Sequence, residues 1–344
     1  MNRIVSTGKI IKMYLSENDL DASMLADASN VSLRTIIRIL NDERPIGMDV
    51  AIGMNKLIPE ISPDFLVSYD SKYQLQKRII EKENGDINVS EVISHYHMKK
   101  LYKDLADDEL ALFEKAKAIF GIENIENRYK VNVDELSFCF SLANGEKDNN
   151  HLIWLKTAYE ECVSERELLK FDEESFLSSF QTIKEKTFAL DIKSALYNMN
   201  SFCKKSGINF YYRKSIPSAR VKAVAVRDKK GFIYIFVSDL FKCVENLWLA
   251  FIHECIHIKN RDFDKVQRIK DNLGADLIDE NYVDEESIGF FIGDATSIDY
   301  SSIDSLISLS NQTNSPLNIV VEIARYKTNN YSNQVFNKYI HYYK

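Results

Sequence analysis

Cysteine is scarce in this chain, and its distribution excludes two kinds of cysteine framework. There are five cysteines, an odd number, and no two of them form a C-x-x-C pair. A disulfide-stapled fold needs paired cysteines, and a cysteine zinc site needs them closely spaced in the sequence. Their scatter favours a reducing compartment, so the sequence predicts a cytoplasmic protein.

Long apolar runs and an excess of basic residues are also absent. No stretch approaches the roughly 20 apolar residues that cross a bilayer. The start, MNRIVSTGKIIKMYL, lacks the apolar region of a signal peptide, so no membrane partner is expected. The formal net charge of −7 disfavours general attraction to nucleic acid, and any contact with DNA must therefore be local.

What remains is ordinary globular composition. The 344 residues are 45% hydrophobic and 28% charged, with 11 glycines and 5 prolines. This length predicts two or three domains.

Residues 8–78 show apolar residues at helical spacing, with short breaks. The stretch Asn30-Val31-Ser32 predicts a turn and then a helix that begins at a capping serine. In the following LRTIIRIL, the isoleucines at 36 and 39 would face inward while Arg34, Thr35 and Arg38 face outward. Two short helices, a tight turn and an exposed polar face are typical of a helix-turn-helix, whose second helix enters the major groove. A small helical bundle with solvated arginines explains the same periodicity.

The run LADASNVSLRTIIRILNDERPIGMDVAIGMNKLIPEISPDFLVSYDSKYQL resembles the HigA-type branch of the XRE helix-turn-helix family. The matching positions are Leu25-Ala26, Val31-Ser32, Thr35-Ile36, Ile39-Leu40-Asn41, Arg44-Pro45-Ile46, Ala51, Ser62-Pro63, Phe65-Leu66 and Tyr73. By position, the resemblance implies that the DNA-facing residues are Ser32, Leu33, Arg34, Thr35 and Arg38. We expect a homodimer on a palindromic operator, because helix-turn-helix readers usually bind as dimers.

The middle of the chain, residues 79–190, is charged and follows a helical pattern. The segments ELSFCFSL, HLIWLKTAYEECV and FDEESFLSSFQTIKEKTFAL are all expected to be helical, the last beginning near Asp172. We predict a helical linker or scaffold without chemistry of its own.

The periodicity changes after residue 207. INFYYR, VKAVAVR and FIYIFVS are rich in β-branched and aromatic residues, and DKKG between the last two indicates a hairpin. The last strand would offer an edge for an extended substrate segment. CVENLWLAFIHECIHIKN then returns to helical spacing, so the predicted fold class is mainly α with a small β-sheet (α+β).

The motif His253-Glu254-Cys255-Ile256-His257 lies in this helix. Residues four apart share a helix face, so His253 and His257 can present nitrogens to one Zn²⁺. Glu254 would project beside them as the general base that takes a proton from the attacking water and passes it to the leaving amine. The alternative is a buried helix in which these residues occur by chance. Chance is improbable, because the chain has only six histidines and two of them lie four residues apart, with a glutamate directly after the first.

Two histidines need a third zinc ligand, usually a carboxylate from a later helix. Two sources are within reach: the run Asp284-Glu285-Glu286 and the pair Asp279-Glu280. Spacing alone does not decide between them.

Residues 190–344 resemble the ImmA/IrrE metallopeptidase family, in particular the fusions in which an XRE domain precedes the peptidase. ARVKAVAVR and ENLWLAFIHECIHI resemble that family's approach to its HExxH helix. Aligning Phe291 with the family's phenylalanine makes Glu285 the third ligand, and this is the ligand that the resemblance leads us to expect; a shift of one residue would make it Asp284. The chain departs from the family at Ile256, Asn260 and Ile288-Gly289, which predicts weaker outer support for the zinc-binding histidines.

Together these patterns predict a helix-turn-helix domain (residues 1–78), a helical middle region (79–190) and a zincin-like HExxH domain (191–344). The resemblances imply a cytoplasmic transcriptional regulator whose zinc endopeptidase domain hydrolyses a regulatory protein, such as a repressor or a toxin–antitoxin partner. The alternative is a non-catalytic repressor or antitoxin whose peptidase-like domain only senses a ligand or partner.

Overall fold

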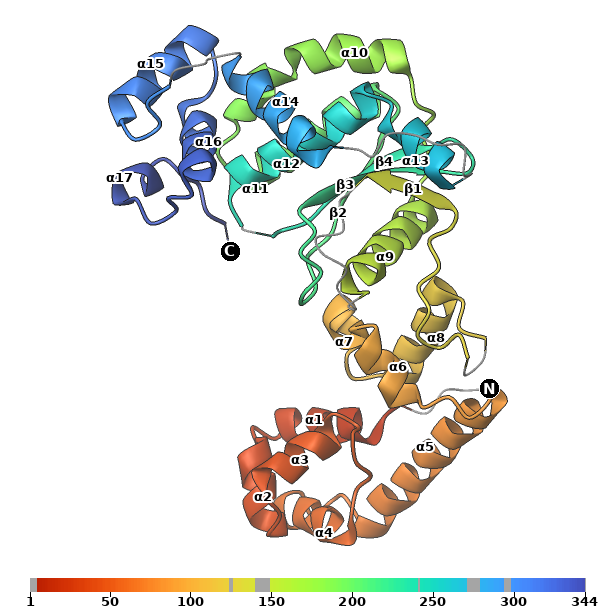
Figure 1. Cartoon of the computed structure of the whole chain (residues 1–344). Helices are drawn as coiled ribbons and strands as arrows, with labels where there is room; N and C mark the ends of the chain where they lie inside the picture. Colours follow the sequence, from red (N-terminus) through yellow and green to blue (C-terminus); the bar gives the residue numbers. More distant parts are fainter. Residues whose placement is uncertain are drawn as a thin grey trace. The chain divides into compact units, whose positions relative to one another are not determined.

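The computed structural model describes residues 5–123, 126–139, 149–240, 242–270, 279–293 and 298–343. The expected fold class is confirmed, since the chain is mostly helical with one small mixed sheet (Figure 1). It divides into two compact units, Met1–Val131 and Asn132–Lys344. The division lies inside residues 79–190, the segment for which the sequence indicated one helical region.

The described part of the first unit is entirely helical. Its elements are α1 (Thr7–Glu17), α2 (Ala22–Ser29), α3 (Leu33–Leu40), α4 (Met48–Leu57), α5 (Pro63–Glu83), α6 (Val89–His95), α7 (Met98–Leu101), the 3-10 turn η1 (Lys103–Leu105) and α8 (Glu109–Phe120). Apolar side chains of α1 to α5, among them Ile11, Leu25, Ile36 and Leu66, form one buried core.

The turn predicted at residues 30–32 is present between α2 and α3. Asn30 ends α2 in the left-handed conformation, with a φ of 54°, and Ser32 begins α3 by accepting a hydrogen bond from the Thr35 N–H. Asparagine tolerates this conformation better than most residues, and serine is a preferred helix cap. These local preferences fix the angle at which α3 leaves α2.

Gly8 allows α1 to approach the end of α3. A Cβ at this position would lie 2.5 Å from the Leu40 carbonyl oxygen, which is closer than atoms can pack. The Gly8 N–H instead donates to the Asp42 carboxylate at 2.9 Å. The C-terminal end of α3 is therefore held by the first turn of α1.

The second unit combines a four-stranded sheet with helices. Its elements are β1 (Leu136–Cys139), α9 (Asn150–Glu165), α10 (Glu173–Thr182), the 3-10 helix η3 (Ile183–Phe188), α11 (Ile192–Lys205), β2 (Asn209–Tyr212), β3 (Ala223–Asp228), β4 (Ile233–Val237), α12 (Val244–Lys259), α13 (Asp262–Lys270), α14 (Glu280–Ile292), α15 (Ile303–Thr313), α16 (Leu317–Thr328) and α17 (Gln334–Asn337). Asp172 caps α10, as its position before an acidic first turn predicted.

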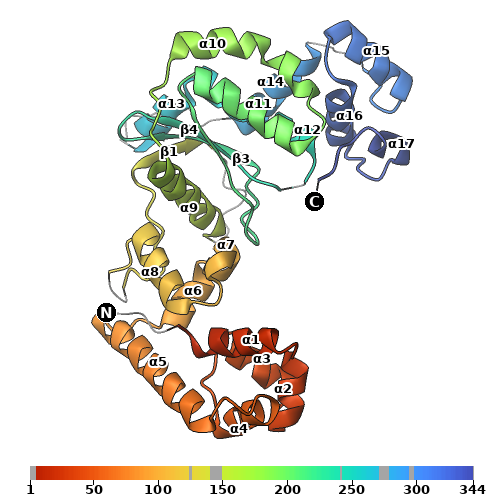
Figure 2. The same cartoon turned by 180° about the vertical axis from the view of Figure 1, so that it is seen from behind.

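The strands lie in the order β1-β3-β4-β2. The predicted hairpin is confirmed, since β3 and β4 pair antiparallel, whereas β2 runs parallel to β4. Strand β4 therefore lies between two neighbours, and the expectation that FIYIFVS offers a free edge is wrong. Figures 1 and 2 show α9 on one face of the sheet and α11 and α12 on the other.

Strand β1 corrects the helix expected for ELSFCFSL. Residues Leu136–Cys139 pair antiparallel with β3, from Leu136 opposite Asp228 to Cys139 opposite Ala225. A short apolar run is compatible with either a strand or a buried helix. Here, pairing with the open edge of β3 makes it a strand.

Helix α12 is the centre of the second unit. It packs on β3 and β4 and against α11, α13, α14 and α16, so nearly all its sides are covered. Cys255 and Ile256 are buried in this core. None of the described helices has both the length and the apolar character that a membrane crossing requires.

Residues near the C-terminus hold the first turn of α12. The Val244 N–H donates to the His341 carbonyl at 3.1 Å, and the Tyr343 N–H donates to the Lys242 carbonyl at 2.9 Å. The carboxylate of Glu245, which is fully buried, accepts the His341 N–H at 3.1 Å and lies 2.6 Å from its Nδ1. The start of this helix is thus fixed by a segment almost one hundred residues later.

Candidate metal centre

Helix α12 presents its two histidines on one face. His253 and His257 are separated by one helical turn, and their Nε2 atoms lie 3.0 Å apart. The His257 side chain is fully buried and that of His253 is 16% exposed. Neither imidazole is free to turn away into solvent.

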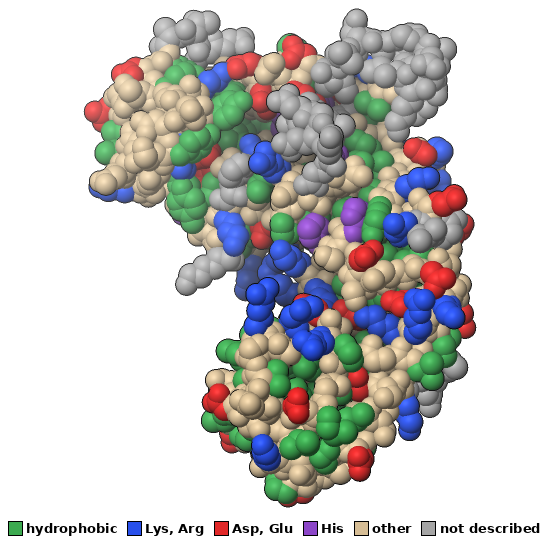
Figure 3. Space-filling model, turned by 60° about the horizontal axis from the view of Figure 1, so that its bottom comes forward, with side chains coloured by type: hydrophobic (Ala, Val, Ile, Leu, Met, Phe, Trp, Pro, Cys, Tyr) green, Lys and Arg blue, Asp and Glu red, His purple; other side chains and the backbone are tan. Residues whose placement is uncertain are grey.

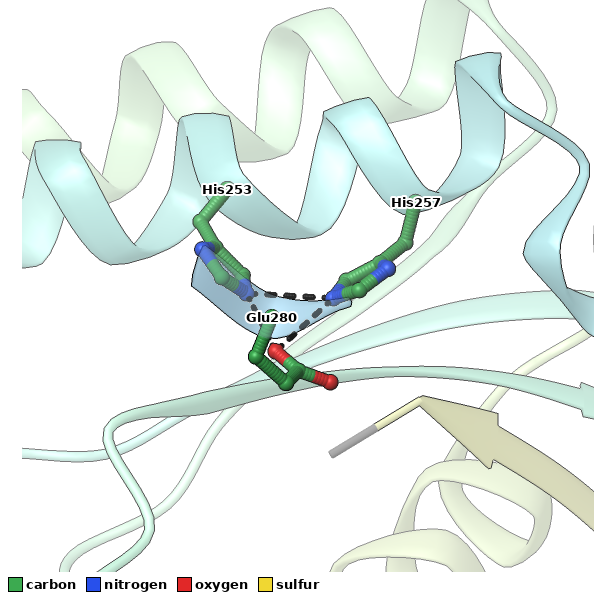
Figure 4. A group of neighbouring side chains, drawn as sticks. All are labelled: His253, His257 and Glu280. Atoms are coloured by element: carbon green, nitrogen blue, oxygen red, sulfur yellow. Dashed lines mark hydrogen bonds and ion pairs between the residues drawn. The ribbon is translucent and has the colours of Figure 1, made fainter. Parts of the chain in front are cut away.

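The third member of the group comes from the first turn of α14. Asp279 caps this helix by accepting the N–H groups of Asn281 and Tyr282, which directs the next residue, Glu280, towards α12. Figure 4 shows both imidazoles pointing at the Glu280 carboxylate. Its Oε2 lies 3.2 Å from Nε2 of His253 and 3.5 Å from Nε2 of His257.

This spacing fits a tetrahedral metal ion. Ligand atoms that lie about 2.0–2.1 Å from one tetrahedral zinc are about 3.3 Å from each other. The three separations here are 3.0, 3.2 and 3.5 Å. Two imidazoles and one carboxylate also form the donor set of catalytic zinc sites, which leave one position open. His253, His257 and Glu280 together could therefore hold a metal ion.

Both histidines have a carboxylate behind the ring. Nδ1 of His257 lies 2.9 Å from Oδ2 of Asp262, and Nδ1 of His253 lies 2.9 Å from Oδ1 of Asp284. Each carboxylate favours a proton on Nδ1 and leaves the Nε2 lone pair facing the other ligands. The outer support that Ile288-Gly289 were expected to weaken is thus supplied from other positions, and that expectation is corrected.

The same carboxylates shift the ionisation of the group. Burial alone would lower the pKa of His253, but its hydrogen bonds with Asp284 and Glu280 outweigh burial and raise it to about 10. In His257, burial is outweighed by Asp262 and Glu280, and the pKa rises to about 9. Two imidazolium Nε2–H groups cannot point at each other across 3.0 Å, whereas one dication satisfies both nitrogens.

Glu254 lies on the next face of α12, against the sheet. Its side chain is buried, and Oε2 accepts the Ala225 N–H of β3 at 2.5 Å. Burial raises the pKa of this carboxyl, while the neighbouring histidines and the Ala225 N–H act in the opposite direction. A buried carboxylate with a raised pKa beside a metal group is suited to accept and return a proton.

The structure places Glu280, and not the expected third ligand Glu285, beside the two histidines. The Glu285 side chain is 63% exposed and forms an ion pair with Lys327 of α16. Of its neighbours, Asp284 reaches the outer side of His253, and Glu286 bonds Lys259 of α12 and Asn260, which caps that helix. The alignment with the family's phenylalanine therefore selected the wrong turn of α14.

A signal for Glu280 was present in the sequence. Glu280, Asp284, Ser287 and Phe291 follow each other at helical spacing along one stripe of α14, and its later members are buried. Glu285 lies well off this stripe. Extending the stripe towards the N-terminus of the helix would have placed Glu280 and Asp284 together on the face that meets α12.

The residues expected to face DNA lie along α3, from its cap Ser32 to Arg38 in its last turn. Ser32, Leu33, Arg34 and Arg38 are exposed and Thr35 is partly buried. The Ser32 and Thr35 hydroxyls are 2.9 Å apart, and Arg38 lies 3.6 Å from Glu43. Ile37, which the sequence did not single out, is 46% exposed one turn after Leu33.

Charge on the first unit is mixed. On the face drawn in Figure 3, acidic, basic and apolar side chains are interspersed over the lowest part of the view, and several Lys and Arg side chains gather near its middle.

No family model matches this sequence, and neither the curated proteins nor the solved structures that were compared with it gave a match. The functional assignment therefore depends on the geometry of these sites.

Proposed function

We propose that this chain is a DNA-binding transcriptional regulator that carries a zinc-dependent endopeptidase centre. The observation that supports it most is the convergence of two imidazole nitrogens and one carboxylate oxygen within 3.5 Å of each other. The proposed substrate is a regulatory protein, such as a repressor or a toxin–antitoxin partner, and the proposed compartment is the cytoplasm.

In this proposal each residue of the second unit has a distinct task. His253, His257 and Glu280 bind the zinc ion, while Asp284 and Asp262 keep the Nε2 lone pairs directed at it. Zinc, when bound, supplies a Lewis acid that makes water acidic enough to react near neutral pH. Glu254 accepts the proton of the attacking water and later returns it to the leaving amine.

The position of Glu254 favours its role as a proton carrier over a role as a ligand. It follows His253 directly, so it projects about 100° around the helix from the ligand face. Its raised pKa brings its proton affinity closer to that of the groups with which it must exchange.

A second candidate is a metal-binding domain without hydrolytic activity. The observation that favours it is the hydrogen bond from the Ala225 N–H to Glu254, which gives this buried carboxylate a purely structural partner. In that case the second unit would act as a sensor, and regulation of transcription would be the whole function.

Glu254→Gln separates the two candidates. We expect this variant to keep stoichiometric zinc and to lose at least about a hundredfold in cleavage rate, since it removes the proton acceptor. Zinc content is measured on the purified protein, and cleavage is measured against proteins encoded beside its gene. Unchanged cleavage in Glu254→Gln would exclude the base assignment, and zinc binding without cleavage in the wild type would favour the sensor.

For the first unit we propose that α3 reads DNA through Ser32, Leu33, Arg34, Thr35 and Arg38, as a homodimer on a palindromic operator. Selection of bound sequences from a random pool at physiological salt tests this. Arg34→Ala should weaken or relax recognition by about 1–3 kcal/mol, whereas Arg78→Ala on α5, which pairs with Glu81 and Asp86, should not. Absence of any preferred sequence would contradict the proposal.

A further inference from the structure

The two carboxylates behind the histidines are held in different ways. Asp262 is buried, with 2% of its side chain exposed, and its second oxygen accepts Lys265 Nζ at 2.6 Å. Asp284 has 41% of its side chain exposed, so water competes for it and its orientation depends on its remaining partners.

The second oxygen of Asp284 is occupied by a tyrosine from another helix. Tyr326, near the C-terminal end of α16, donates its hydroxyl to Oδ2 of Asp284 at 3.1 Å. The other oxygen, Oδ1, faces Nδ1 of His253 at 2.9 Å. A continuous chain of hydrogen bonds thus runs from Tyr326 through Asp284 to His253.

The neighbouring residue strengthens this link. Lys327 forms an ion pair with Glu285, so two successive residues of α16 bind two successive residues of α14. Two adjacent contacts fix the last turn of α16 on α14 more firmly than one, and the Tyr326 hydroxyl is held where it meets Asp284.

We propose that Tyr326 is a positioning residue of the metal centre, which acts only through Asp284. This inference rests on the proposed zinc site. The hydroxyl lies behind the imidazole, on the side of Nδ1, whereas the ligand atom of His253 is Nε2. Tyr326 therefore does not touch the reacting atoms; it keeps Asp284 from rotating into solvent, and Asp284 keeps His253 aimed at zinc.

A double-mutant cycle on the full chain tests this route. The variants are Tyr326→Phe, Asp284→Ala and the two combined, with Tyr197→Phe as control, because Tyr197 is 73% exposed on α11. The zinc dissociation constant is measured at fixed pH by competition with a chromophoric chelator. The visible spectrum of the cobalt-loaded protein reports ligand geometry, and thermal unfolding of the metal-free protein reports folding.

Loss of an outer partner costs about 10- to 100-fold in metal affinity, which we expect for Asp284→Ala. Tyr326→Phe should raise the dissociation constant about threefold to tenfold, since it leaves Asp284 in place but less fixed. The cobalt spectrum should change while the metal-free unfolding temperature does not. In the Asp284→Ala background the tyrosine substitution should have no further effect, because its route is already broken.

Two results would overturn the role of Tyr326. One is an unchanged zinc affinity in Tyr326→Phe; the other is that Tyr326→Phe weakens zinc binding as much in the Asp284→Ala background as it does alone. If Asp284→Ala does not fold, Asp284→Asn takes its place in the cycle. Wild-type protein that binds no zinc would overturn the proposed metal centre itself, and the two failures are therefore distinct.

Discussion

Both units bury carboxylates between helices, but the two centres are built differently. In the first unit, Glu109 is 1% exposed, and its oxygens meet Lys77 Nζ at 2.6 Å and Lys99 Nζ at 3.2 Å. Each acceptor there has its own donor. In the second unit, Nε2 of His253, Nε2 of His257 and Oε2 of Glu280 lie within 3.5 Å of each other, and none of the hydrogen bonds described at these three atoms comes from a lysine or an arginine.

This difference separates a structural cluster from a ligand site. A buried carboxylate that is matched by ammonium groups needs nothing more, because charge and hydrogen bonds are both satisfied. Acceptors that converge on one point are stable only with a cation at that point. The Glu109 cluster is therefore complete as it stands, whereas the His253 group could hold a metal ion.

The largest expected effect tests which carboxylate completes the ligand group. Glu280→Ala should weaken zinc binding by more than about a hundredfold, since it removes a ligand and not an outer partner. Glu285→Ala should leave zinc affinity unchanged, because its carboxylate faces Lys327. Chelator competition measures both. If Glu285→Ala lost zinc while Glu280→Ala still bound it, Glu285 would be the third ligand, as the family resemblance implied.

The next effect tests the Glu109 cluster. Glu109→Gln should destabilise the first unit by about 3 kcal/mol, because it leaves two lysines without their buried counter-charge. Zinc affinity should stay unchanged. Both tryptophans, Trp154 and Trp248, lie in the second unit, so their fluorescence follows that unit while circular dichroism follows both.

The matched control for Glu109→Gln is Glu17→Gln, at the exposed end of α1. This variant should unfold like the wild type. Equal stability of the two variants would mean that the Glu109 ion pairs contribute nothing measurable.

The smallest effect concerns pH. Burial raises the pKa of Asp42 from 3.8 to about 6, although hydrogen bonds with Ser6 and Gly8 oppose the shift. A carboxyl with a raised pKa in the folded state keeps its proton longer than in the unfolded state. Its contribution therefore favours folding at low pH and is lost as pH rises through about 6.

As the pH rises from 4 to 6, ionisation of Asp42 should lower the unfolding free energy of the first unit by about 2 kcal/mol. Asp42→Asn should remove that part of the pH dependence and leave the second unit unaffected. Denaturant titrations at several pH values measure the slope. An identical slope in wild type and Asp42→Asn would show that another group titrates in this range.

The sequence predicted those parts of the fold that depend on local preferences. The turn at Asn30–Ser32, the cap at Asp172 and the hairpin between β3 and β4 each follow from residues next to each other in the chain. The pair His253 and His257 belongs to this class, since one helical turn fixes their spacing.

The features that sequence reasoning missed depend on contacts between distant segments. Strand β1 forms because β3 offers an edge more than eighty residues later, and β4 is internal because β2 covers it. Glu280 was passed over because the resemblance fixed the register of α14, whereas the face that meets α12 is set by packing. Tyr326 lies 42 residues from Asp284, and no local pattern connects them.

The attachment of the C-terminal segment to α12 has a consequence for the order in which the protein matures during synthesis. Glu245 and the two histidines leave the ribosome well before His341, yet the buried Glu245 carboxylate takes two of its partners from that residue. A nascent chain can form the first unit while this anchor is still missing. Helix α12 reaches its final setting only after residues 341–343 have been made, so a chain synthesised only as far as this helix carries the two histidines without the frame that holds them.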